Sequence, residues 1–337
     1  MPIKLLVVDD SAFMRKIISD LVKDIDGIEI IGVARNGLDA LNSIPKLKPD
    51  IITLDIEMPK LNGIDALREI KRNYNIPVIM LSSHSGSDIT MEALQIGAVD
   101  FIEKPTDLNT DLIELKNELK IKITTVFSCN LKTSVIQPFA GDLPHHQVVN
   151  KAKAIDAVVI GASTGGPKAL FNIISKIPKE FKIPIFIVQH MPKGFTTSFA
   201  SRLNDECSIP VVEAQDKMIY HKGMIYVAPG DYHMTIDKSK IRLNTKDKMY
   251  GVRPAVDYLF YSASEVFRDK LLGIILTGMG RDGTNGMAAI KENGGYNLVQ
   301  NEETCVVYGM PGSAVSKGVV HEILSLNEIS NRLNRNI

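Results

Sequence analysis

The first 120 residues alternate between short apolar runs and stretches in which apolar residues recur at helical spacing. The apolar runs cover residues 3–8, 28–34, 51–54, 78–81 and 99–102. Between them, apolar side chains stand three or four positions apart, as at Phe13, Ile17 and Leu21. This alternation is typical of βα units in a parallel sheet. We therefore predict an α/β domain of five strands and five helices at residues 1–121.

A second α/β domain is predicted at residues 153–337. Strand-like runs cover residues 155–160, 184–188, 210–213, 224–228 and 271–276. Helical spacing is found at residues 168–176, 196–203 and 255–267. Two alternating segments within residues 232–244 flank a polar tetrapeptide, which predicts a β-hairpin. We expect a doubly wound sheet with this hairpin added, and we expect Asp231 and Asp257 to be ordinary turn and helix residues.

Residues 122–152 are predicted to form a linker between the two domains. The segment 124–150 loses the periodicity, is rich in Ser, Thr, Asn, Gly and Pro, and carries a His-His pair. This composition is typical of an interdomain linker. Its apolar side chains, Val126, Phe127 and Phe139, can still dock on a domain surface.

The charge balance excludes several classes of function. The 337 residues include 39 Lys and Arg against 39 Asp and Glu, for a formal net charge of +0. Proteins that bind nucleic acid usually carry a basic surface, so we expect no nucleic-acid partner. No apolar run approaches the roughly 18 residues that a membrane-spanning helix needs, so we expect no direct membrane insertion. Three distant cysteines and the absence of a secretory signal at the start predict a cytoplasmic protein.

Carboxylates follow the predicted strands of the first domain. In a doubly wound sheet the carboxyl ends of the strands share one edge, and ligands bind there. The first apolar run ends at Asp9 and Asp10, and the third ends at Asp55. Three carboxylates this close repel one another, and their oxygen atoms suit Mg²⁺. Lys104 follows the last run and is expected to add a fixed positive charge beside them.

The Gly-rich turn at residues 161–167 has two possible functions. It follows an apolar run and opens a helical stretch, so it can bind a phosphate on free backbone N–H groups or present Ser163 as a nucleophile. The next strand ends at Gln189 and His190, not at the acid that a dinucleotide site requires. A histidine at this edge is suited to act as a general base for the serine.

The acid of a catalytic triad is expected in a second Gly-rich turn. The last predicted strand leads into this turn, which carries Asp282. Ser163, His190 and Asp282 each follow a separate strand and should meet at one edge. An alternative in the chain order of the α/β-hydrolases uses His321 as base, with Asp231 or Asp282 as acid. We disfavour it because His321 follows no comparable strand.

The order Asp9-Asp10, Asp55, Ser82 and Lys104 resembles the receiver domain of response regulators, over residues 1 to about 120. The resemblance implies a flavodoxin-like (βα)5 fold. It also implies that Asp55 accepts a phosphoryl group from a partner histidine kinase.

The same resemblance implies a Mg²⁺ site made by the three carboxylates and the backbone carbonyl of Glu57. The metal and Lys104 then stabilise charge on the transferring phosphoryl group. Ser82 is implied to bind another phosphoryl oxygen, and Phe101 matches the aromatic position that moves with it.

Three segments of the second half resemble the catalytic domain of the chemotaxis protein-glutamate methylesterases, the CheB family. They are Gly-Ala-Ser163-Thr-Gly-Gly-Pro, Val-Gln-His190-Met-Pro and Leu-Thr-Gly-Met-Gly-x-Asp282-Gly. The resemblance implies hydrolysis of glutamate γ-methyl esters on methyl-accepting chemoreceptors, and deamidation of particular glutamines, without a cofactor. It implies Ser163 as nucleophile, His190 as general base and acid, and Asp282 as the orienting carboxylate. Thr164 and Met279 are implied to support the oxyanion.

Two hypotheses of different classes follow. In the first, the chain is a monomeric, phosphorylation-regulated esterase, and its first domain covers the Ser163 cleft until Asp55 is phosphorylated. In the second, it is a response regulator whose second domain only binds a phosphate-bearing ligand through the Gly-rich turns.

Overall fold

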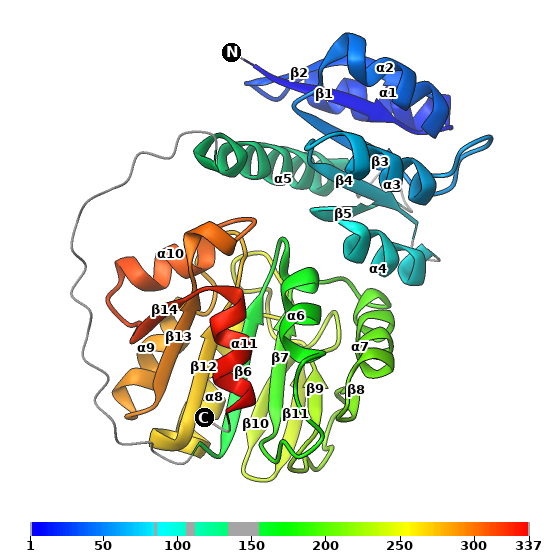
Figure 1. The fold of residues 1–337 in the computed structure, drawn as a ribbon. Coiled ribbons are helices and arrows are strands. Elements are labelled where there is room, and N and C mark those ends of the chain that lie inside the picture. The colour runs from blue at the N-terminus through cyan, green and yellow to red at the C-terminus, as the bar shows by residue number, and fades with distance from the viewer. Residues whose placement is uncertain (1, 84–85, 106–111, 134–154, 336–337) are drawn as a thin grey trace.

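The computed structural model describes residues 2–83, 86–105, 112–133 and 155–335. Two α/β domains are present, as the sequence predicts, and they pack against each other (Figure 1). No helix within the described ranges is long and apolar enough to span a bilayer.

The first domain is a parallel sheet with strand order β2-β1-β3-β4-β5, the flavodoxin-like order that the resemblance implied. Its strands are β1 (Ile3–Val8), β2 (Ile28–Ala34), β3 (Ile51–Asp55), β4 (Val78–Ser82) and β5 (Asp100–Glu103). Its helices are α1 (Ala12–Lys23), α2 (Gly37–Leu47), α3 (Gly63–Asn73), α4 (Ser87–Ile96) and α5 (Leu112–Thr133). Strands β3 and β4 are buried along their whole length, which explains why they are continuous apolar runs in the sequence.

Helix α5 is longer than the sequence analysis predicted. We placed the start of the linker at residue 122, but the helix continues to Thr133. Ile123 and Val126 are 0% and 2% exposed and extend the buried stripe of α5 into the core of the first domain. This burial outweighs the low helix propensity of the surrounding Ser and Thr residues. The rest of the predicted linker, residues 134–152, lies outside the described residues.

The second domain is a seven-stranded sheet with order β14-β13-β12-β6-β7-β9-β8, in which every neighbouring pair is parallel. Its strands are β6 (Ala157–Ala162), β7 (Ile185–Gln189), β8 (Val211–Glu213), β9 (Ile225–Val227), β12 (Leu271–Ile275), β13 (Tyr296–Gln300) and β14 (Glu322–Leu324). The predicted hairpin is present as β10 (His233–Asp237) and β11 (Lys240–Asn244).

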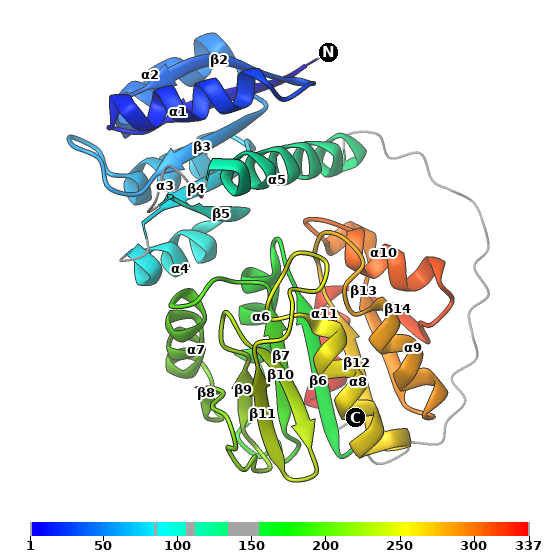
Figure 2. The same ribbon diagram turned by 180° about the vertical axis from the view of Figure 1, so that it is seen from behind.

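Helices cover both faces of this sheet. They are α6 (Gly166–Ile174), α7 (Phe195–Glu206), α8 (Val256–Phe267), α9 (Thr284–Glu292), α10 (Gly309–Ser316) and α11 (Leu326–Asn334), with short 3-10 turns at Arg268–Lys270 and Glu302–Thr304. Helices α6 and α11 lie on the face seen in Figure 1, and α8 lies on the face seen in Figure 2 together with the hairpin. The sheet is therefore doubly wound, as predicted.

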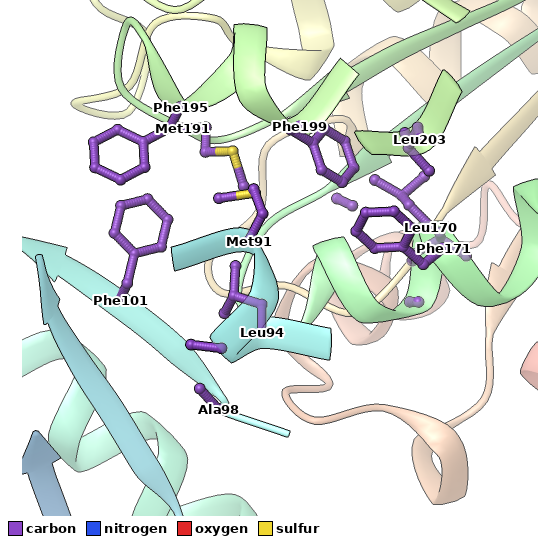
Figure 3. Close-up of a cluster of buried hydrophobic side chains, with 14 of the residues drawn as sticks. Met91, Leu94, Ala98, Phe101, Leu170, Phe171, Met191, Phe195, Phe199 and Leu203 are labelled. Carbon is purple, nitrogen blue, oxygen red and sulfur yellow. The ribbon is translucent and has the colours of Figure 1, made fainter. Parts of the chain in front are cut away.

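The two domains share one continuous apolar cluster. Figure 3 shows Met91 and Leu94 of α4 directed toward Met191 and the helices α6 and α7 of the second domain. Phe101 of β5 stacks on Phe195, with ring centroids 4.5 Å apart. The first domain therefore docks through the α4–β5 side of its sheet.

Polar contacts surround this apolar cluster. The Gln95 side chain of α4 accepts a hydrogen bond from Arg202 Nε at 2.8 Å and donates one to Glu206 Oε1 at 2.6 Å. The hydroxyls of Ser87 and Ser198 are hydrogen-bonded at 2.8 Å. Helices α4 and α7 thus meet along an interface that is apolar at its centre and polar at its margin.

Candidate active site

Three neighbouring strands deliver the predicted catalytic residues to one edge of the second sheet. Strands β12, β6 and β7 are adjacent, in that order, and run in parallel. Ser163 follows β6, His190 follows β7, and the turn carrying Asp282 follows β12. The three side chains line one cleft of about 900 Å³.

The Ser163 turn is fixed by hydrogen bonds from three directions. The Ser163 N–H donates to the Thr277 carbonyl at 3.1 Å. The Ser163 carbonyl accepts from the Gly166 N–H at 2.7 Å and from Gln189 Nε2 at 3.0 Å. Gly165 has φ +75°, a left-handed conformation that favours glycine. The glycines of this turn thus allow a sharp passage from β6 into α6, with the serine at its apex.

His190 is oriented by Asp282. Its Nε2 lies 2.8 Å from Asp282 Oδ2, and the two side chains are 11% and 2% exposed. The neutral imidazole carries one proton, and an ionised carboxylate holds that proton on Nε2. Nδ1 is therefore the nitrogen that keeps a lone pair and can act as a base.

Asp282 is held ionised at the start of helix α8. Its carboxylate accepts hydrogen bonds from the backbone N–H groups of Val256 at 2.6 Å, Asp257 at 2.9 Å and Gly283 at 2.9 Å. Burial opposes ionisation, but the bond from His190 and these amide bonds outweigh it and hold the pKa of Asp282 below its ordinary value. The positive end of the α8 dipole acts in the same direction.

No hydrogen bond joins the Ser163 hydroxyl to His190 in the described part of the chain. Catalytic hydrogen bonds of this kind are often long without substrate and tighten when it binds. The structure therefore places the Ser163 and His190 side chains in one cleft without a direct hydrogen bond between them.

The two residues implied to support the oxyanion both touch the first domain. Thr164 Oγ1 donates to Asp100 Oδ2 of β5 at 2.6 Å. Met279 Sδ accepts from Thr125 Oγ1 of α5 at 3.2 Å. The first domain also lines the cleft with residues of β5 and α5. The sequence analysis did not predict Asp100 or Thr125 as site residues. The nearest residue that it singled out was Phe101, next to Asp100.

The alternative triad is not assembled. His321 precedes β14 and therefore lies at the amino edge of the sheet, opposite Ser163. Its ring stacks on Tyr296, with centroids 4.5 Å apart, and its Nδ1 accepts from the Asn297 N–H at 2.9 Å. Asp231 is exposed at the cleft.

Asp257 is a helix residue, as predicted, but its side chain is buried in the first turn of α8. It is 0% exposed and accepts hydrogen bonds from the Gly286 N–H at 2.6 Å and the Tyr250 hydroxyl at 3.3 Å. Burial and the nearby Asp282 charge raise its pKa to about 6. The sequence feature that could have indicated this is a carboxylate among the apolar residues of the first turns of α8.

The predicted phosphoacceptor site lies at the corresponding edge of the first sheet. Carboxylate oxygens of Asp9, Asp10 and Asp55 all lie within 4.8 Å of one another. Lys104 Nζ lies 2.9 Å from Asp9 Oδ2 and 2.7 Å from Asp55 Oδ1. Burial raises the pKa of Asp55 to about 6, although Lys104 opposes this shift. The oxygen-only donor set fits Mg²⁺, and the exposed Glu57 follows Asp55 by two residues.

The two residues predicted as switch positions, Ser82 and Phe101, lie between this site and the second domain. The Ser82 hydroxyl is hydrogen-bonded to Thr90 Oγ1 at 2.6 Å, at the base of α4. Phe101 is 4% exposed and forms the stack on Phe195 described above. The contacts of Ser82 and Phe101 thus place α4 and β5 between the Asp55 site and the interface with the second domain.

Comparison with known proteins matches both halves of the chain. Residues 158–333 match the family CheB methylesterase, and residues 5–115 match the response regulator receiver domain. A protein-glutamate methylesterase/protein-glutamine glutaminase of Clostridium acetobutylicum is 46% identical over 341 residues, which cover 98% of this chain and 96% of the relative. A protein of the same name from Thermotoga maritima is 41% identical over 338 residues, or 98% of this chain and 97% of the relative.

A solved structure supports the second half separately. The crystal structure of the Thermotoga maritima CheB methylesterase catalytic domain aligns with 42% sequence identity and a TM-score of 0.53. The alignment covers 55% of this chain and 100% of that chain.

Proposed function

Because the chain belongs to the CheB methylesterase family and carries a receiver domain in front of the catalytic domain, we propose that Ser163, His190 and Asp282 perform its ester hydrolysis. The enzyme is a phosphorylation-regulated hydrolase, and we take its substrates to be glutamate γ-methyl esters of chemoreceptors. The observation that carries the residue assignment is the bond between His190 Nε2 and Asp282, which leaves Nδ1 as the basic nitrogen.

The reaction proceeds in two acyl transfers. Nδ1 of His190 takes the hydroxyl proton as Ser163 Oγ attacks the ester carbonyl, and Asp282 stabilises the imidazolium. The tetrahedral intermediate collapses, and methanol leaves with the proton from His190. Water then attacks the acyl-serine with His190 as base, which releases the glutamate carboxylate and regenerates the serine. A glutamine substrate follows the same path with ammonia as the leaving group, and neither path requires a cofactor.

Two backbone groups are suited to bind the oxyanion. Among the described hydrogen bonds, none uses the N–H of Thr164 or Met279, and both residues line the cleft. A donor of this kind typically contributes about 3 kcal/mol to transition-state stabilisation. Because the side chains of both residues bond to the receiver domain, its position also affects the oxyanion site.

The receiver domain is proposed to accept its phosphoryl group on Asp55 from the histidine kinase of the chemotaxis system. Asp9, Asp10 and the Glu57 carbonyl would hold the Mg²⁺, which neutralises charge on the transferring group. Lys104 reaches both Asp9 and Asp55 and can follow the phosphoryl oxygens. We place both activities in the cytoplasm.

We propose occlusion as the mode of regulation. In the structure, β5 and α5 of the receiver domain line the cleft that contains Ser163. Phosphorylation at Asp55 would shift Phe101 and α4 and weaken the docked interface, which opens the cleft. The phosphate-ligand hypothesis is not favoured, because it gives no role to the buried bond between His190 and Asp282.

The test is methanol release from methylated receptor, with and without a small-molecule phosphodonor and Mg²⁺. Ser163→Ala should lower kcat on the order of 10⁶-fold, since the nucleophile is lost. Ser175→Ala, at the end of the same helix α6, is the matched control and should retain activity. Methanol release by Ser163→Ala at the wild-type rate would refute the assignment.

A further inference from the structure

The catalytic-domain wall of the cleft carries an excess of cations. Its lining residues include Lys193, Lys248, Arg253 and Arg281. Against them, Asp282 is engaged by His190, and Asp231 is the other acid that this wall contributes. Three of the cations, which we call the basic rim, are exposed at the cleft: Lys193, Lys248 and Arg281.

Within the described part of the second domain, no acidic side chain forms an ion pair with the basic rim. Among the described residues, no ion pair involves Lys193 or Arg281. The Arg281 guanidinium lies over the Tyr250 ring, 5.1 Å from its centroid. The Tyr250 side chain is fixed in turn by its hydroxyl, which donates to Asp257 and accepts from Asn285 Nδ2 at 2.9 Å. Arg281 is thus supported in place while its charge stays unneutralised.

The third cation of the rim is paired with a carboxylate of the receiver domain. Lys248 Nζ lies 3.7 Å from Glu114 Oε1, and these side chains are 49% and 79% exposed. Glu114 belongs to the first turn of α5, on the opposite wall of the cleft. The docked receiver domain therefore already places one carboxylate against the rim.

The remaining charges of the receiver wall are largely neutralised. Lys122 pairs with Asp100 at 3.2 Å and with Glu118 at 2.7 Å. Lys104 is engaged by the phosphoacceptor site. Glu114 is a receiver carboxylate that forms an ion pair with the rim.

We propose that the basic rim binds carboxylates that flank the esterified glutamate on the substrate helix, and that Glu114 competes for the same cations in the docked state. This inference rests on the proposed function of the cleft. The methyl ester itself is neutral, so it gives the rim nothing to bind, whereas acidic neighbours one helical turn away do. Each hydrolysis also converts an ester into a carboxylate, so binding strengthens as a segment with several esters is demethylated.

Binding is measured on full-length Ser163→Ala, phosphorylated with an acyl phosphate and Mg²⁺, so that the substrate is not consumed. The probes are two fluorescent helical peptides with one glutamate γ-methyl ester, flanked by glutamates in one and by glutamines in the other. The acidic peptide should bind about tenfold more tightly at low salt, and the difference should shrink in 0.5 M salt. Lys248→Gln and Arg281→Gln should each reduce this preference severalfold, whereas Lys240→Gln, on the exposed hairpin outside the cleft, should not.

A second variant tests the competition. In the unphosphorylated chain, Glu114→Gln should tighten binding of the acidic peptide severalfold and leave binding of the neutral peptide unchanged. Equal affinity for both peptides, or a preference that survives both rim substitutions, would overturn the inference. Stronger capture by anionic phospholipid vesicles than by the acidic peptide would assign the rim to a membrane surface and overturn it as well. Failure of the proposed function is seen separately, as the absence of methanol release from either peptide by the chain with Ser163 intact.

Discussion

At the scale of single residues, the proposed chemistry depends on the Asp282 carboxylate, whose partners are all hydrogen-bond donors. Asp282 receives three backbone N–H groups and the imidazole of His190. No partner of either oxygen is an acceptor. The position therefore requires an acid, both for its charge and for its hydrogen-bonding pattern.

Asp282→Asn should reduce kcat on the order of 10⁴-fold. The amide removes the charge that stabilises the imidazolium, and its NH₂ group must face a donor whichever way it turns. The free energy of unfolding should fall as well, which separates this residue from a purely catalytic one. Methanol-release kinetics and urea unfolding measure the two effects. Asp231→Asn, an exposed acid of the same cleft, is the control and should change neither.

Asp257 predicts a pH-dependent stability. Its pKa is raised from 3.8 to about 6, so its contribution to stability is complete below pH 4 and is lost as pH rises through 6. Replacing it with Asn removes this dependence. The difference in unfolding free energy between Asp257→Asn and wild type should move in favour of the variant by about 1 to 2 kcal/mol from pH 5 to pH 8.

Urea unfolding at the two pH values measures this shift. The comparison between variant and wild type cancels the other titrating groups of the chain. Asp205→Asn, at an exposed position of α7, serves as control. A pH-independent difference for Asp257→Asn would show that the buried carboxyl does not ionise in this range.

At the scale of elements, the catalytic geometry comes from two Gly-rich turns that touch. A Cβ on Gly278 would lie 2.9 Å from Ser163 Cβ and 2.4 Å from Met310 Sδ. Gly278→Ala should therefore displace the nucleophile and lower kcat about 100-fold, because small displacements of reacting groups carry a large cost in rate. Gly280→Asn is the matched control in the same turn, since a Cβ there meets open space and Asn tolerates φ +86°. Single-turnover kinetics would show whether acylation is the affected step.

The strands whose ends were predicted best are those that are buried throughout. Strands β3, β4 and β12 are buried at every residue, and their ends differ from prediction by at most one position. Strand β13 was missed because it contains Asn297 and Gln300, which are buried and polar. The Asn297 amide donates to the carbonyls of Met287 and Val319 at 2.7 and 2.9 Å, partners that only the folded chain supplies.

In the candidate site, too, the sequence predicted the residues at strand ends but not the contacts that orient them. Strand ends indicate Ser163, His190 and Asp282, since the turns that follow these apolar runs lie at the ligand edge. The contacts that orient them come from Val256, Asp257 and other residues far away in the sequence, and no local pattern encodes them. The receiver contacts to Thr164 and Met279 depend on how the two domains dock, so the sequence could not predict them either.

At the scale of the whole molecule, one interdomain interface lies between the phosphoacceptor edge of the first sheet and the Ser163 edge of the second. The phosphoacceptor pocket, α4 and β5 form one side, and α7 with the Ser163 turn forms the other. Interdomain packing is apolar at its centre, so a charge introduced there should separate the domains without phosphorylation.

Met91→Asp tests this coupling in a chain that cannot be phosphorylated. Asp55→Asn alone should hold methanol release at the unphosphorylated rate, whether or not phosphodonor and Mg²⁺ are present. Met91 is 0% exposed and faces Met191 across the interface (Figure 3), so an aspartate there is buried without a partner while the domains are docked. A destabilisation of a few kcal/mol shifts the docking equilibrium more than tenfold toward the open state. The double variant should therefore release methanol at least tenfold faster than Asp55→Asn.

Ile89→Asp provides the control on the same helix, because Ile89 remains 40% exposed while the domains are docked. It should leave the rate of Asp55→Asn unchanged. Circular dichroism and urea unfolding show whether the receiver domain stays folded in both double variants. If Met91→Asp leaves the rate unchanged although limited proteolysis shows that the domains have separated, removal of the receiver domain is insufficient for activity. Phosphorylation would then act by an activating contact that the receiver domain makes, and the occlusion mechanism would be wrong.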